Sequence, residues 1–181
     1  DSRTPFFTDE DEKRLLFELS QMSNKNHLRL TKLALATGFR RSELLSLNWS
    51  NIDLKKRIIY IYRKNCAATD NSSGLKLVPL PEKAQKILEE LNERNGKVIE
   101  LSKGAARNGF DKARKKAGLE TLRFHDLRHI AISRMWSSGM NALEISACSG
   151  HRDIKMLMRY SHYQLSFKLI TFPLGGGLFI G

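Results

Sequence analysis

The sequence predicts a mainly α-helical domain with one small antiparallel β-sheet, an α+β fold. Apolar residues recur at helical spacing along much of the chain. Two segments, 57–62 ("RIIYIY") and 75–80 ("LKLVPL"), have instead the apolar, β-branched composition of strands. With 181 residues, no internal repeat and no clear domain boundary, the chain fits one domain with a sizeable core.

The first part of the chain predicts three helices. Thr8 and Asp11 have the spacing of a helix-capping box, and acidic residues and leucines at helical spacing follow them. The second helix, "NHLRLTKLALATGF", is expected to stop at Gly38 in the left-handed conformation. A short third helix, about 41–47, follows directly.

The middle of the chain predicts a hairpin and then a helix. The two strands pair across the polar loop "NCAATDNSSG". Pro81 then starts an amphipathic helix that is expected to end at Asn95 and Gly96. The segment "KVIEL" (97–101) is a candidate for a further short strand.

Three helices and a tail complete the prediction. A basic helix lies between a capping Ser102 and a closing Gly118, a second helix spans about 124–138, and a final one surrounds "DIKMLMRYS". The domain is expected to end near residue 165. The tail 166–181 is apolar and glycine-rich, and the sequence leaves open whether it docks on a partner subunit, packs on its own domain, or is foreign to the native protein.

The charge of the chain points to a polyanionic partner. Lysine and arginine number 31 against 19 acidic residues, a net charge of +12. Such a surplus favours nucleic acid, because each phosphate neutralised releases condensed counterions. The sequence has no apolar run of about 20 residues and no signal-peptide pattern. Cys66 and Cys148 match no metal spacing and no disulfide framework, which favours a reducing, cytoplasmic setting.

Four separate segments carry basic, imidazole and phenol side chains that suit a phosphate site. They are "ATGFRRSELLSL", "YRKN" at the end of the first strand, "HDLRH" and "SGHRDIKMLMRYSHY". In "HDLRH" the histidine and the arginine are three apart and so share a helical face. In chain order the candidate residues are Arg40 with Glu43, Lys64, His125, Arg128, His151 and Tyr160.

These segments closely resemble the catalytic domain of the tyrosine recombinases, the phage-integrase family. The family pattern is an arginine after a Gly-x pair with a nearby glutamate, a lysine in a β-hairpin, His-x-x-Arg, Gly-His, and a tyrosine nine residues later. The similarity runs from about Thr8 to Tyr163. It implies a tyrosine recombinase catalytic-domain-like fold over 1–165, an integrase-type site-specific recombinase that acts through a 3′-phosphotyrosyl intermediate, and no metal or other cofactor.

The residue types agree with this chemistry. A tyrosine can form a covalent phosphotyrosine and later leave as phenolate, the role expected of Tyr160. Arg40 and Arg128 can clamp the non-bridging oxygens with guanidinium groups that keep their charge, and Glu43 can orient Arg40. The remaining expected roles are hydrogen bonding to the phosphate by His151, proton exchange with the tyrosine by His125, and protonation of the departing 5′-oxygen by Lys64.

Several assignments stay open. Lys76 is the alternative to Lys64, because family hairpins usually place the lysine closer to the "VPL" strand than Lys64 lies, which indicates an insertion in this loop. Tyr163 is the rival nucleophile. Arg41 is expected on the surface and His129 in the core. On the basic helix, phosphate contacts are expected from Arg107, Lys112, Arg114 and Lys115.

The resemblance also implies partners and leaves rival functions. Family members usually carry an amino-terminal DNA-binding domain, which we expect to be absent from this sequence, and act as four protomers on double-stranded DNA. The fragment alone is expected to be monomeric, and a bacterial or phage gene is expected to encode it. The rivals are a non-catalytic DNA-binding module, a type IB topoisomerase, and a metal-dependent nuclease, for which Asp126 and Asp153 alone supply too few acids.

Overall fold

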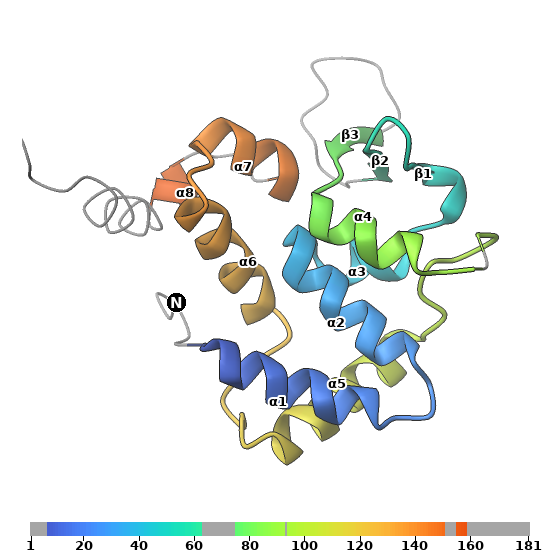
Figure 1. The fold of residues 1–181 in the computed structure, drawn as a ribbon, viewed down its shortest axis with the longest axis vertical. Helices are drawn as coiled ribbons and strands as arrows, with labels where there is room; N and C mark the ends of the chain where they lie inside the picture. Colours follow the sequence, from blue (N-terminus) through green and yellow to red (C-terminus); the bar gives the residue numbers. More distant parts are fainter. Residues whose placement is uncertain (1–6, 63–74, 93, 151–154, 159–181) are drawn as a thin grey trace, which may run out of the picture.

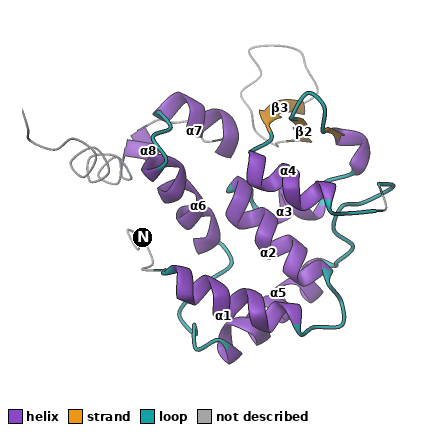
Figure 2. Ribbon diagram, viewed as in Figure 1, coloured by secondary structure: helices purple, strands orange, loops and turns teal. Residues whose placement is uncertain are grey.

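The computed structural model describes residues 7–62, 75–92, 94–150 and 155–158. They form a mainly helical domain with a three-stranded antiparallel sheet at one edge, which confirms the predicted fold class (Figures 1 and 2). The elements in chain order are α1 (Asp9–Ser20), α2 (Asn26–Thr37), α3 (Arg41–Leu45), a 3-10 turn (Trp49–Asn51), β1 (Ile52–Asp53), β2 (Ile58–Tyr62), β3 (Leu75–Pro79), α4 (Glu82–Glu89), α5 (Lys103–Lys116), α6 (Asp126–Ser137), α7 (Ala142–Ser149) and α8 (Lys155–Met158).

The predicted helix signals act as expected at three ends. The Thr8 hydroxyl accepts a hydrogen bond from the Asp11 backbone N–H (3.1 Å), and the Asp11 carboxylate accepts one from the Thr8 N–H (2.9 Å), a complete capping box. Gly38 ends α2 with φ 67°, a conformation that glycine adopts at low cost. Ser102 caps α5 by accepting the Ala105 N–H at 3.1 Å.

The sheet has one strand more than predicted. β2 lies between β1 and β3, with Ile59 opposite Val78 and Ile52 opposite Ile59. β1 is only two residues long, too short for a periodic pattern to reveal it. The segment 97–101 is not a strand: it forms one isolated bridge, from Lys97 to Asn48, and Val98 and Ile99 are buried in the core.

Two helices are shorter than predicted. α4 ends at Glu89 instead of Asn95, because residues 92 and 94–96 are exposed polar side chains and a glycine with no apolar face to bury. α6 begins at Asp126, since a tight turn precedes it in which the Asp126 carboxylate accepts the Arg123 N–H at 2.7 Å. The turn places His125 at the N-cap position.

Helix α2 is the centre of the fold, and it contacts α1, α3, α4, α5 and α6. The main core lies around it. A smaller apolar cluster joins α6, α7 and α8 through residues that include Ile132, Trp136, Ile145 and Leu157. Figure 1 shows α7 and α8 at the end of α6 farthest from α1, so α6 connects the two clusters. No helix in the described ranges is long and apolar enough to cross a lipid bilayer.

Candidate functional site

An arginine-rich pocket of about 400 Å³ opens where the α2–α3 junction, α5 and the start of α6 meet. Three phenylalanines and six arginines form most of its wall, and the lining includes one acidic residue. Its lining residues are Phe39, Arg40, Arg41, Arg107, Phe110, Asp111, Arg114, Arg123, Phe124, His125 and Arg128. The pocket therefore gathers three of the predicted catalytic residues, Arg40, His125 and Arg128, from segments more than 80 positions apart in sequence.

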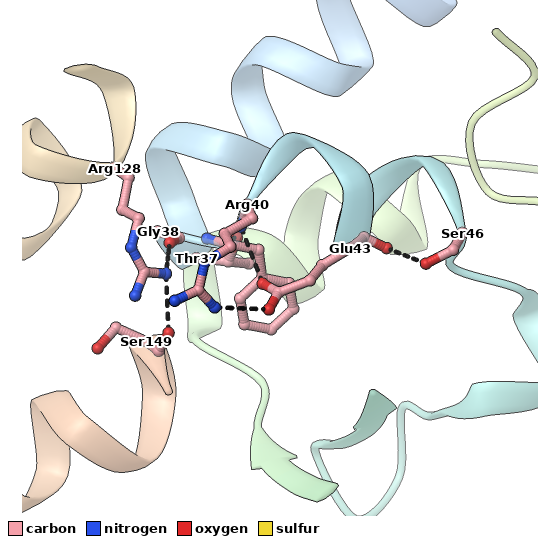
Figure 3. A network of polar contacts seen from close by, with 8 residues as sticks. Thr37, Gly38, Arg40, Glu43, Ser46, Arg128 and Ser149 are labelled. Carbon is pink, nitrogen blue, oxygen red and sulfur yellow. Dashed lines mark hydrogen bonds and ion pairs between the residues drawn. The ribbon is translucent and has the colours of Figure 1, made fainter. Parts of the chain in front are cut away.

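Arg40 is oriented by Glu43, as the spacing predicts. Arg40 is the N-cap of α3, and Glu43 stands at the third helical position. The Glu43 carboxylate is buried, at 7% exposure, and accepts both the Arg40 backbone N–H (2.9 Å) and its guanidinium (3.1 Å), while the Arg40 side chain keeps 48% of its surface exposed (Figure 3). The buried Glu43 carboxylate thus orients the Arg40 guanidinium, and the exposed part of the Arg40 side chain lines the pocket.

Arg128 is buried and joins two helix ends. Its side chain is 4% exposed, and one terminal nitrogen donates to the carbonyls of Gly38 (2.6 Å) and Ser149 (2.8 Å) (Figure 3). These carbonyls lie at the carboxyl ends of α2 and α7, where the helix dipole favours a cation. The Arg128 guanidinium is therefore held in place by the same hydrogen bonds that join the carboxyl ends of α2 and α7.

His125 lies at the rim of the pocket as an exposed residue whose ring packs edge-to-face on His129, with the centroids 5.2 Å apart. Desolvation by the surrounding protein lowers the pKa of His125, the positive charges of Arg128 and Arg40 lower it further, and Asp126 opposes them. The imidazole is therefore mainly neutral at neutral pH. His129, which we expected in the core, is only half-buried, and its ring packs against that of the exposed His125.

We expect an NMR titration of His125 to give a midpoint below the ordinary value of 6.5. Asp126→Asn should lower the midpoint further, because the carboxylate stabilises the imidazolium, and Arg40→Gln should raise it, because the guanidinium repels a second positive charge. Because the pKa of His125 is lower in the folded protein, the unfolded chain binds the imidazole proton more tightly than the folded protein does. The stability contributed by the neutral imidazole is therefore lost as the pH falls through 6.5 and below. A midpoint at or above 6.5 in the wild type would show that desolvation and the neighbouring arginines do not lower the pKa of His125.

The four residues predicted on the basic helix divide into two pairs. Arg107 and Arg114 line the pocket, while Lys112 and Lys115 are exposed and lie outside its lining. Asp111 binds Arg114 at 2.7 Å and Arg107 at 3.8 Å, and the hydrogen bond from Arg114 lowers the pKa of the Asp111 carboxyl. The Arg114 guanidinium also donates to the Glu120 carbonyl, so it supports the turn after α5.

Two pocket arginines were missed by the sequence prediction. Arg41 is half-buried instead of on the surface, and its guanidinium lies 5.8 Å from the centroid of the Phe124 ring. Arg123 lines the pocket from the turn before α6. Its position directly before Phe124 and His125 was the available signal, but only packing shows that this turn faces α5.

Other predicted residues lie outside the described part of the chain: Lys64, His151, Tyr160 and Tyr163. For Lys76 only the backbone is described, and it pairs with Ile61 in the hairpin. Gly150, the residue before His151, ends α7 with φ 69°.

The chain is similar in sequence to integrases and recombinases. The phage integrase family matches residues 5–166. A shufflon-specific DNA recombinase of Escherichia coli is 38% identical over 143 residues, which are 76% of this chain and 35% of that protein. The integrase of Salmonella phage P22 is 26% identical over 151 residues, 74% of this chain and 38% of that protein. The chain therefore spans between a third and two fifths of the length of these relatives.

Solved structures agree with this assignment. The catalytic domain of bacteriophage HP1 integrase superposes with a TM-score of 0.69 and 26% identity, over 93% of this chain and 95% of that domain. XerH recombinase bound to a palindromic difH substrate has a TM-score of 0.66 over 91% of this chain and 51% of its own, and at 19% identity it shows the fold alone. A lambda integrase dimer on a COC′ core site has a TM-score of 0.64 over 86% of this chain and 47% of its own, at 20% identity. On the family match, the relatives and the fold together, the chain belongs to the phage integrase family, the tyrosine recombinases, and corresponds to their catalytic domain.

Proposed function

We propose that this chain is the catalytic domain of an integrase-type site-specific DNA recombinase that cleaves and rejoins strands through a 3′-phosphotyrosyl intermediate. The observation that carries the proposal is the pocket, in which Arg40, Arg128 and His125 meet. Two guanidiniums with a neighbouring imidazole suit a phosphodiester, whose charge rises in the transition state. The family membership supports the same reaction.

In the proposed cleavage step the Tyr160 phenol attacks the scissile phosphorus. The phenolic proton passes to His125, which is mainly neutral at neutral pH and so able to accept it. The bond from phosphorus to the 5′-oxygen breaks, Lys64 protonates that oxygen, and the 3′-phosphate stays joined to the protein. Lys76 is the alternative acid.

The two arginines act while the phosphorus is five-coordinate. Arg40, held by Glu43, and Arg128, held by the two helix carbonyls, bind the non-bridging oxygens, and His151 supplies a further hydrogen bond. Rejoining is the reverse reaction with a different strand: its 5′-hydroxyl attacks the phosphotyrosine and the phenolate leaves. The phosphodiester energy is thereby kept in the protein–DNA bond.

The partner in this proposal is double-stranded DNA, with four protomers in the active assembly and a monomer in its absence. The relatives support the partner: XerH and lambda integrase have been solved on DNA. The bacterial and phage sources of the relatives support a protein that acts on DNA inside a bacterial cell. Residues 1–165 would carry the catalytic function, and 166–181 would be a tail that either docks on a neighbouring protomer or is foreign to the native protein.

Covalent trapping tests the proposal. The protein is mixed with a labelled pool of nicked duplexes of random sequence, denatured in detergent, and examined for a slowly migrating protein–DNA band. We expect the wild type and Tyr163→Phe to give the band and Tyr160→Phe to give none, because phenylalanine lacks the attacking oxygen.

The tyrosine three positions away makes Tyr163→Phe a matched control. A band lost only in Tyr163→Phe would show that the nucleophile is wrongly assigned. DNA binding by the wild type without any band, unchanged in Tyr160→Phe, would instead support the non-catalytic DNA-binding module.

A further inference from the structure

The pocket holds more arginines than one phosphate requires. Arg40 and Arg128 have their own supports, the Glu43 carboxylate and the two helix carbonyls. A second group comes from three other positions, the first residue of α3, the first half of α5 and the turn before α6. This second group is Arg41, Arg107 and Arg123.

An aromatic pair lies among these three arginines. The rings of Phe110 and Phe124 meet edge to face, with their centroids 5.1 Å apart, and both line the pocket. The Arg41 guanidinium carbon is placed over the Phe124 ring, 5.8 Å from its centroid, a cation–π contact that uses none of the guanidinium N–H groups as hydrogen-bond donors to an acid. Arg107 and Arg123 are close to the same pair in sequence, three residues before Phe110 and one before Phe124.

The charges of this group are poorly compensated. Asp111 is the one acid in the lining against six arginines, and its carboxylate is closer to Arg114 (2.7 Å) than to Arg107 (3.8 Å). Arg107 is 74% exposed. Among the residues that the structure describes, the guanidiniums of Arg41 and Arg123 form no ion pair. Like charges gathered in a concave surface produce a local positive potential that attracts an anion.

We propose that Arg41, Arg107 and Arg123 form a second anion subsite, which binds a DNA phosphate other than the one held by Arg40 and Arg128. The assignment to DNA rests on the proposed function. Duplex DNA presents one charge per about 1.7 Å of helix axis, so a strand whose scissile phosphate enters the pocket brings its neighbours to the rim. Guanidinium forks match phosphate oxygens in geometry, and the aromatic pair limits the orientations that Arg41 can take.

The salt dependence of DNA binding tests the subsite. Binding of a labelled duplex is measured by fluorescence anisotropy over a range of salt concentrations for the wild type and for Arg41→Gln combined with Arg123→Gln. We expect the slope of log affinity against log salt to fall by about 1 in magnitude, the loss of one phosphate contact.

The matched control removes the same charge elsewhere. Lys13→Gln combined with Lys116→Gln alters two exposed lysines outside the pocket, each beside a glutamate of α1, and should change the slope much less. An equal change in both double variants would overturn the subsite, because it would reflect net charge alone. If the slope stays constant and inorganic phosphate stabilises the wild type but not the arginine variant, the subsite binds free phosphate and the DNA assignment is wrong.

Combination with Arg40→Gln shows whether two phosphates are involved. Separate phosphates predict that the slope changes of Arg40→Gln and of the arginine double variant add, whereas one shared phosphate predicts that they do not, which would overturn the proposal. Anisotropy measures binding of the duplex and does not depend on bond breakage. Failure to trap a covalent adduct would therefore count against the proposed function, and the salt dependence would still test the subsite.

Discussion

Arg128→Ala is expected to slow covalent adduct formation by about 100- to 1000-fold and to lower the free energy of unfolding by about 2–4 kcal/mol. The first effect follows from the loss of a charged donor to the transition state. The second follows from the carbonyls of Gly38 and Ser149, which lose a charged partner inside the protein. Adduct yield over time and urea unfolding measure the two effects.

Arg128→Lys separates the two roles. A lysine keeps the charge and can donate to the helix carbonyls, so we expect it to recover much of the stability. It lacks the planar fork that grips two phosphate oxygens, so we expect the reaction to stay slow. Arg123→Ala is the matched control for stability, since this exposed side chain supports no helix end, and its change should stay within about 0.5 kcal/mol. Full stability of Arg128→Ala would contradict the role in joining α2 and α7.

Gly109→Ala is expected to destabilise the protein by about 1–3 kcal/mol, although alanine is the better helix former. Gly109 on α5 faces the ring of His27 on α2. A Cβ atom there would clash with Nδ1 and Cε1 of His27, so the ring or the helix must move. The Nδ1 atom is buried at this contact and has no hydrogen-bond partner among the described residues.

Gly104→Ala provides the control on the same helix. Its nearest neighbour would be the Ser102 hydroxyl at 4.0 Å, so we expect no loss and up to about 1 kcal/mol of gain in urea unfolding. His27→Ala should remove most of the penalty of Gly109→Ala in the double variant, which a double-mutant cycle measures. Equal stability of Gly109→Ala and Gly104→Ala would show that the two helices are less closely packed at this point.

Local signals in the sequence predicted most of the elements. The Thr8 capping box, the left-handed Gly38 and the Ser102 cap depend on neighbouring residues only, and all three are present. Two of the errors occur where neighbours do not decide the outcome. β1 exists because it pairs with β2, and 97–101 is buried without forming a strand, so both depend on contacts with distant segments.

The candidate site shows the same division. The sequence by itself determined which residue types could serve a phosphate and that Glu43 would orient Arg40, because a three-residue spacing on a helix acts locally. Tertiary structure decided that Arg40, His125 and Arg128 share one pocket, that Arg107 and Arg114 join them while Lys112 and Lys115 do not, and that Arg41 and Arg123 belong there. The physical reason is that spacing along one helix sets which side chains are neighbours, whereas the faces that meet depend on how α2, α5 and α6 pack.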